Sequence, residues 1–171
     1  GWVVWCCRFS HWKGKKLKSL PLKLNKFPIS PLFIPANKLD WIDKTFQKGA
    51  DSIIIDLEDS ISENEKDQAR EDLYSHLKQN NYVGELIIRV NPVDDKFGQE
   101  DIKLLSSTAL SVSAFMLPKI EDCSLIDNLP EINIIALLET PNAINNISLI
   151  ARDKKVKGLA LGGADLSASL G

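Results

Sequence analysis

Histidine and cysteine are scarce in this sequence, which has two histidines and three cysteines among 171 residues. His11 lies in an atypical N-terminal stretch and His76 on the exposed side of a predicted helix, which excludes a histidine-based triad and a zinc site. Cys6 and Cys7 are adjacent and Cys123 is remote, so their spacing fits neither a disulfide framework nor a metal site. We therefore expect a reducing, intracellular setting.

The sequence also lacks any apolar run near the ~18 residues that a membrane span requires, which argues against a membrane anchor. Its first 39 residues contain eight Lys or Arg and no acidic residue, leaving 13 basic against 23 acidic residues in the remainder. Residues 40–171 therefore carry a net negative charge, which disfavours binding to the negatively charged phosphates of nucleic acid. Residues 1–28 are interpreted as a disordered basic leader, with organelle targeting as the alternative. The expected location is accordingly cytoplasmic, with the mitochondrion as the alternative.

What the sequence does contain, from residue 29 on, is an alternation of short apolar runs with amphipathic stretches. The runs predict strands at 32–34, 52–57, 86–90, 114–117, 134–138 and 159–161. Helices are predicted between them, one capped by Asn37, one from Gln99 to about Ser106, and one from Pro141 through Ile150. Such βα units indicate a parallel sheet buried on both faces.

Two α/β architectures satisfy this pattern, a doubly wound sheet and a (β/α)₈ TIM barrel. No Gly-x-Gly-x-x-Gly follows the first predicted strand and no phosphate-binding loop occurs anywhere, which lowers the nucleotide-binding version. We predict a TIM barrel over residues 29–171, truncated after about six βα units. Because the chain has no initial Met and stops at Gly171, directly after a predicted strand and its loop, we expect it to be a fragment.

Two of the predicted strands deliver an acid to their carboxyl ends, where barrel active sites gather. Glu139 follows one strand and Asp165 the next, and neighbouring strand ends lie about 5 Å apart, which suits two carboxylates sharing one Mg²⁺. Gly162 and Gly163 let backbone and ligand approach closely. The alternative is that both acids only cap the helices that follow them.

Other polar residues end the remaining strands. Arg89 fits a substrate carboxylate or a thioester carbonyl, or else a structural ion pair with Glu58 or Asp59. Asp56 and Glu58 are two residues apart, so strand alternation places them on the same face. There they are expected either to orient Arg89 or bound waters, or to help move protons. The last two candidates are Asn91, for substrate binding, and Lys119, as a stabiliser of a developing enolate or a solvated loop lysine.

Taken together, six stretches resemble the citrate lyase beta subunit branch of the HpcH/HpaI aldolase family. They are PLFIPAN at 31–37, KGADSIIIDLEDSI at 48–61, IIRVNPVDDKFGQEDI at 87–102, FMLPKIE at 115–121, ALLETPNAI at 136–144 and GLALGGADLSASLG at 158–171. The resemblance implies a TIM barrel that binds Mg²⁺ through Glu139 and Asp165 and contacts substrate through Arg89. No single short motif carries it.

The resemblance also implies a reaction. Members cleave or form a carbon–carbon bond next to a carbonyl, which here implies a magnesium-dependent lyase acting on a citryl-CoA or malyl-CoA type of thioester. The alternatives are a pyruvate-type 2-oxo acid aldolase and a non-catalytic fragment that keeps the metal site. The implied partners are an acyl-CoA or oxo acid substrate and further protein copies, either in a homo-oligomer of the full-length protein or in a lyase complex.

Overall fold

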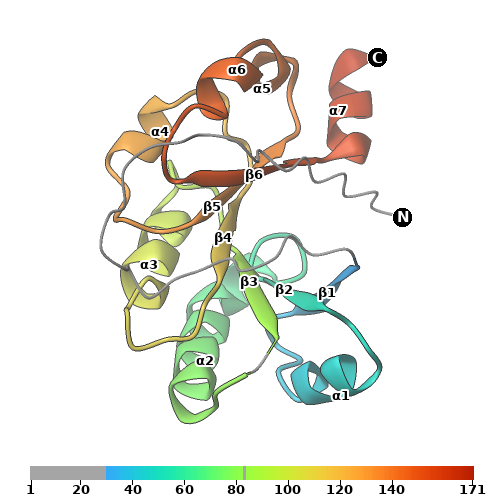
Figure 1. The fold of residues 1–171 in the computed structure, drawn as a ribbon, viewed down its shortest axis with the longest axis vertical. Coiled ribbons are helices and arrows are strands. Elements are labelled where there is room, and N and C mark those ends of the chain that lie inside the picture. Colours follow the sequence, from blue (N-terminus) through green and yellow to red (C-terminus); the bar gives the residue numbers. More distant parts are fainter. Residues whose placement is uncertain (1–29, 83) are drawn as a thin grey trace, which may run out of the picture.

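The computed structural model describes residues 30–82 and 84–171, so the predicted leader at 1–28 lies outside the described residues. Strands and helices alternate along the chain (Figure 1). The strands are β1 (Pro31–Pro35), β2 (Ser52–Asp56), β3 (Glu85–Arg89), β4 (Ala114–Leu117), β5 (Ile134–Leu138) and β6 (Val156–Leu161). The helices are α1 (Trp41–Gln47), the 3₁₀ turn η1 (Glu63–Glu65), α2 (Lys66–Gln79), α3 (Lys96–Leu105), α4 (Ser124–Asp127), α5 (Pro141–Asn145), α6 (Ile147–Ile150) and α7 (Gly163–Leu170).

The sheet is parallel throughout and its spatial order, β1-β2-β3-β4-β5-β6, is the order of the sequence. A doubly wound sheet reverses its order at a switch point, whereas a barrel adds each strand to the same side of the last. The predicted α/β fold is therefore confirmed, and its strand order is that of a barrel and not of a doubly wound sheet. Within the described residues the sheet is an open arc with β1 and β6 at its edges.

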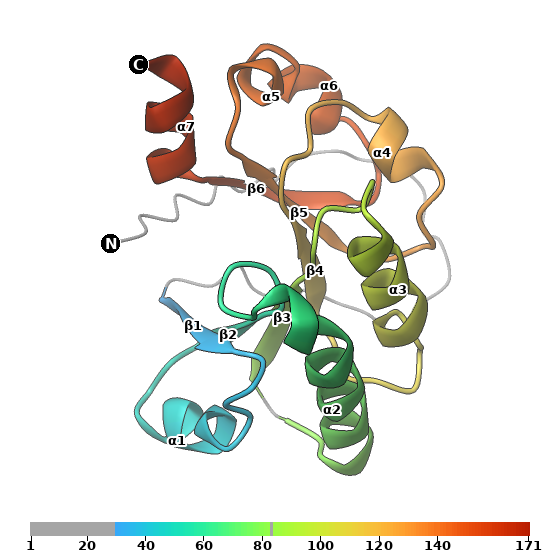
Figure 2. The same ribbon diagram turned by 180° about the vertical axis from the view of Figure 1, so that it is seen from behind.

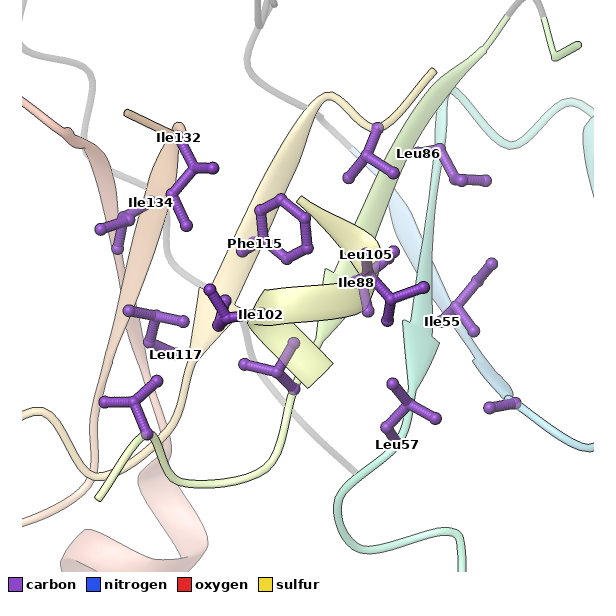
Figure 3. Packing of buried hydrophobic residues seen from close by; sticks show 14 of the residues in the cluster. Ile55, Leu57, Leu86, Ile88, Ile102, Leu105, Phe115, Leu117, Ile132 and Ile134 are labelled. Atoms are coloured by element: carbon purple, nitrogen blue, oxygen red, sulfur yellow. The ribbon is translucent and has the colours of Figure 1, made fainter. Parts of the chain in front are cut away.

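One face of the curved sheet packs against helices, which follow its outer side in both views (Figures 1 and 2). Every second strand residue points to this face because strand side chains alternate. Ile102 and Leu105 of α3 reach the strand residues Ile88 and Phe115, as Figure 3 shows. This layer contains most of the buried apolar side chains and is the principal core.

The opposite face carries a second, smaller apolar cluster, which includes Ile54, Ile87, Met116 and Leu137. Ile54, Ile87 and Leu137 each lie two residues before the polar residue at the end of their strand, which is Asp56, Arg89 or Glu139. Parallel pairing sets Asp56 directly beside Arg89, in line with the pair Ile54 and Ile87 two residues earlier. The candidate site therefore begins where this inner apolar cluster ends.

Helix boundaries differ from the predicted ones at three places. Asn37 does not cap α1, because the chain first makes a turn in which Lys38 N–H bonds to the Pro35 carbonyl. α3 begins three residues earlier than predicted, since the Asp95 carboxylate accepts the Phe97 N–H as its N-cap. The predicted helix from Pro141 is divided into α5 and α6.

None of the helices in the described part of the chain has the length and apolar character needed to cross a membrane.

Candidate active site

Arg89 and Asp56 form a bidentate ion pair at the carboxyl ends of β2 and β3. Arg89 Nε and Nη2 donate to the two carboxylate oxygens of Asp56, each at 2.7 Å, and Arg89 is only 3% exposed. Burial alone would raise the pKa of Asp56, but the Arg89 guanidinium, together with the hydrogen bonds from Glu58 and Ser60, holds that pKa below its usual range. Charge-assisted, bidentate pairs of this kind are strong and geometrically specific. The pair is fixed by the strand register.

Two further carboxylates surround the third nitrogen of Arg89. Nη1 lies 3.2 Å from Glu58 Oε2 and 3.0 Å from Asp59 Oδ2. The ring of Phe33, from β1, lies 5.2 Å from the guanidinium carbon. Both Glu58 and Asp59, foreseen as ion-pair partners, thus reach Arg89, yet Asp59 is 56% exposed whereas Glu58 is buried.

Burial raises the pKa of Glu58 to about 7, with Arg89 acting against the rise and the carboxylates of Asp59 and Glu139 adding to it. A carboxyl group with a pKa near neutrality can both take up and release a proton at physiological pH. Glu58 is the described side chain in this site best suited to proton transfer.

Asn91, predicted to bind substrate, lies instead in a buried network behind the site. Its side-chain nitrogen donates to Leu57 O at 3.2 Å and to Asp101 Oδ2 at 2.8 Å, and its side-chain oxygen accepts from Lys66. These bonds engage both ends of the amide within the chain and give Asn91 a structural role, and its binding of substrate stays a prediction.

The network contains three residues that sequence reasoning missed, Lys66, Arg70 and Asp101. Lys66 Nζ donates to the carbonyls of Leu57 at 3.1 Å and Glu58 at 2.7 Å, and Arg70 Nε donates to Asp101 Oδ1 at 2.7 Å. Two oppositely charged residues on the apolar faces of α2 and α3 were the available signal, since unpaired charges are excluded from such faces. They tie the loops after β2 and β3 to the helix layer.

Glu139, at the end of β5, is held by its two neighbouring loops. Its Oε2 accepts the backbone N–H of Lys119 at 3.2 Å. On the other side, a Cβ added to Gly162 would lie 2.4 Å from Glu139 Cγ, so any other residue at position 162 would displace the Glu139 side chain. Thr140, not Glu139, caps α5 by accepting the Ala143 N–H, so the capping alternative for Glu139 is wrong.

Burial raises the pKa of Glu139, and the carboxylates of Asp165 and Asp59 add to the rise, whereas the Lys119 N–H and Arg89 oppose it. Asp165 lies exposed in the first turn of α7, whose N-cap is Gly162, so Asp165 is not the cap residue either. Gly163 has open space where a side chain would be, in contrast to Gly162.

Lys119 connects the two halves of the site. Its backbone contacts Glu139, while its Nζ lies 4.0 Å from Glu58 Oε1 on a side chain that is 62% exposed. Its φ is +53°, in the left-handed region. The lysine that was predicted either to stabilise an enolate or to be solvated therefore sits between two site carboxylates.

The donors at this edge fit a hard divalent cation. Carboxylate oxygens are what Mg²⁺ prefers, and Mg²⁺ commonly takes one or two protein carboxylates, with water and substrate completing its shell. No group of three or more His, Cys, Asp or Glu arranged to hold a metal occurs among residues 30–82 and 84–171, so a closed protein cage is not formed there. The two acids Glu139 and Asp165 suit the more open kind of site.

A family model and several known proteins match most of this chain. The model of the HpcH/HpaI aldolase/citrate lyase family matches residues 30–171. A (3S)-malyl-CoA thioesterase of Cereibacter sphaeroides is 30% identical over 146 residues, which are 82% of this chain and 50% of the relative. The citrate lyase subunit beta of Leuconostoc mesenteroides subsp. cremoris is 31% identical over 129 residues, 75% of this chain and 42% of the relative.

Among solved structures, CitE of Mycobacterium tuberculosis superimposes with a TM-score of 0.73 at 29% identity, over 84% of this chain and 57% of that chain. That structure is a complex with magnesium and pyruvate, and further structures of the mycobacterial protein contain oxaloacetate and magnesium, or magnesium, acetoacetate and coenzyme A. The chain spans about half the length of the curated relatives it matches. By fold and by sequence over residues 30–171, it belongs to the HpcH/HpaI aldolase/citrate lyase family.

Proposed function

We propose that this protein is a magnesium-dependent carbon–carbon lyase that acts on a CoA thioester of the citryl-CoA or malyl-CoA type. The observation that carries the proposal is the buried carboxylate Glu139, which shares the β5–β6 edge with Asp165 and has a raised pKa. An acidic sheet edge beside a buried arginine suits a substrate that bears both a metal-binding oxo acid and an anionic group. The ligands of the mycobacterial relative support the same substrate class.

Glu139 and Asp165 are the residues proposed to hold Mg²⁺. The ion, when bound, supplies positive charge that polarises the oxygens of the oxo acid. Glu139 is suited to this role because the Lys119 N–H and the bare Cα of Gly162 set its orientation before any ligand arrives. Pre-orientation of a ligand side chain lowers the cost of binding.

Arg89 is proposed to contact the substrate through Nη1. Its Nε and Nη2 are engaged by the buried Asp56, whereas Nη1 lies against the buried Glu58 and the exposed Asp59. A substrate oxygen that takes the place of the Asp59 carboxylate would meet a guanidinium already fixed by Asp56. Because Asp59 is 56% exposed, water can solvate its carboxylate once the substrate oxygen has replaced it at Nη1, which lowers the cost of the exchange.

Glu58 is proposed to move the proton. In the cleavage direction the substrate hydroxyl loses a proton, the carbon–carbon bond breaks to give the oxo acid, and the resulting thioester enolate takes up a proton at carbon. A carboxyl group with a pKa of about 7 can accept that first proton on a carboxylate oxygen. The Lys119 ammonium, 4.0 Å from Glu58 Oε1, favours the ionised form of Glu58 that accepts it.

A second candidate is thioester hydrolysis, favoured by the similarity to (3S)-malyl-CoA thioesterase. A third, a pyruvate-type aldolase, uses the same metal and arginine on a substrate without CoA. The products separate these reactions. Acetyl-CoA plus an oxo acid indicates the lyase, free CoA plus a hydroxy acid indicates the thioesterase, and pyruvate release from a CoA-free substrate indicates the aldolase.

The test compares the wild-type protein with Glu139→Ala and Asp165→Ala, using Glu71→Ala on the exposed side of α2 as a matched control. We expect Mg²⁺ titration calorimetry to show binding by the wild type and by the control, and a loss of at least about tenfold in each site variant. Cleavage of (3S)-malyl-CoA should fall in parallel. Normal Mg²⁺ affinity and activity in both site variants would refute the proposal, and Mg²⁺ binding without turnover in the wild type would favour the non-catalytic alternative.

A further inference from the structure

The backbone of Lys119 has an unusual conformation beside the proposed metal site. Among residues 30–82 and 84–171 it is the only non-glycine residue with a positive φ, at +53°. A left-handed conformation crowds the Cβ of an ordinary residue, and only Gly, Asn and Asp adopt it readily. A lysine persists there only where the surroundings compensate.

The conformation coincides with a contact to the proposed metal site. Directly after β4 and Pro118, the Lys119 N–H donates to Oε2 of Glu139, 20 residues further along the chain, with a separation of 3.2 Å, and the positive φ sets how the chain leaves this peptide group. The side chain, by contrast, is mostly exposed, and its ammonium is 4.0 Å from the nearest carboxylate oxygen. The backbone contact to Glu139 is thus the closer of the two.

The opposite side of Glu139 is also formed by backbone. A Cβ on Gly162 would come within 2.4 Å of Glu139 Cγ and 2.8 Å of Oε1. The carboxyl group therefore lies between the N–H of the loop after β4 and the bare Cα of the loop after β6. These two loops flank β5 on either side, since the sheet order is β4-β5-β6.

We infer that Lys119 is a positioning residue that acts through its left-handed backbone, which orients the Glu139 carboxylate toward a bound cation. The inference rests on the proposed function for the identity of that cation as Mg²⁺. It makes the conformation of residue 119, not its ammonium group, the determinant of the carboxylate's orientation. Residue types that adopt positive φ should then replace lysine.

The test uses Lys119→Gly, Lys119→Asn and Lys119→Val. All three remove the ammonium, but glycine and asparagine keep the left-handed conformation and the β-branched valine opposes it. By titration calorimetry we expect Lys119→Gly and Lys119→Asn to bind Mg²⁺ within about threefold of the wild type, and Lys119→Val to bind about tenfold more weakly. Equal weakening in all three, or in none, would overturn the inference.

The same three substitutions at Lys38 provide the control. Lys38 is an exposed turn lysine whose φ is not positive, so none of them should change Mg²⁺ affinity.

A second measurement separates this inference from the proposed function. Hydrogen exchange of the residue 119 amide reports the bond to Glu139 without any metal. We expect protection in the wild type, in Lys119→Gly and in Lys119→Asn, and faster exchange in Lys119→Val and in Glu139→Leu. If the wild type binds no Mg²⁺, the proposed function fails, and the exchange pattern still decides the role of Lys119. Exchange unchanged in Glu139→Leu would contradict that role.

Discussion

The two ends of the candidate site each hold a buried carboxylate, and they differ in whether a positively charged side chain bonds it. At the β2–β3 corner, made of Asp56, Glu58 and Arg89, a guanidinium bonds Asp56 twice and holds its pKa low. At the β5–β6 corner, made of Glu139 and Asp165, the nearest donor to Glu139 is a neutral backbone N–H, and the pKa of Glu139 is raised. At the first corner Asp56 is compensated by Arg89 within the chain, and only Glu58 beside the pair keeps a raised pKa. The second corner has no such internal cation bonded to Glu139 and has an excess of negative charge.

This difference indicates which corner is organised by folding and which is organised for a ligand. A buried carboxylate that lacks a cation costs free energy, and proteins tolerate that cost chiefly where a ligand removes it. The β5–β6 corner is therefore the side for an external cation, and the β2–β3 corner is the fixed reference against which substrate is placed. Each prediction below tests one part of that contrast.

The largest effect is expected from Arg89→Met, which removes the internal cation of the β2–β3 corner. Asp56 is then left buried and unpaired, and breaking a buried ion pair in this way costs about 3–5 kcal/mol of unfolding free energy. Urea denaturation at pH 7 measures the loss. Arg152→Met, at an exposed arginine, is the control and should change stability by less than about 0.5 kcal/mol. A similar small change for Arg89→Met would mean that the corner is not balanced by this pair.

The next effect concerns the pH dependence of stability through Glu58. Its pKa is about 7 in the folded protein against 4.5 for an ordinary Glu, so the folded state binds the extra proton between those values. Its contribution to stability is complete below pH 4.5 and is lost as the pH rises through 7, a change of roughly 3 kcal/mol. Relative to Glu58→Gln, the wild type should lose that amount between pH 4 and pH 8. Parallel stability curves for the two proteins would rule out the raised pKa.

Much of this contrast could be predicted from the sequence, because the pattern of apolar residues locates the ends of the strands. Continuous apolar runs bounded by turns predicted the strands, two of them with the observed bounds, 114–117 and 134–138. Alternation then placed Asp56 and Glu58 on one face, and both contact Arg89. Periodicity located each strand of the described sheet, although β6 begins at Val156 and not at Leu159 as predicted.

The parts that could not be predicted lie just after the strands, where alternation no longer applies. Asn91 follows Arg89 by two residues, yet its amide turns into the helix layer because Asp101 and Lys66 are there to bond it. No sequence pattern predicts the positive φ of Lys119 either, because a Pro-Lys pair does not favour the left-handed conformation. Both features depend on contacts between residues distant in the sequence.

A smaller effect of opposite sign is expected from Glu139→Gln in the metal-free protein. The raised pKa means that ionised Glu139 opposes folding, so its contribution is favourable at low pH and is lost as the pH rises. Removing the charge should raise the unfolding free energy at pH 8 by about 1 kcal/mol and have little effect at pH 4. Chemical denaturation without and with Mg²⁺ tests this, because saturating Mg²⁺ should stabilise the wild type only. Destabilisation at pH 8 would show that Glu139 is compensated like Asp56.

The smallest effect on stability, and the sharpest test of how the two corners cooperate, is expected from Asp59→Asn. Asp59 is exposed and pairs with Arg89 Nη1, so its loss should change the unfolding free energy by less than about 0.5 kcal/mol. The proposed substrate competes with this carboxylate for Nη1, so oxaloacetate should bind several-fold more tightly in the presence of Mg²⁺. Mg²⁺ affinity alone should change less, since Asp59 is a lesser contributor than Asp165 to the raised pKa of Glu139. Asp94→Asn, at another exposed loop acid, should alter neither affinity. Weaker oxaloacetate binding by Asp59→Asn would instead make Asp59 part of the substrate site, and the fixed corner would then include a residue that stays in place when substrate enters.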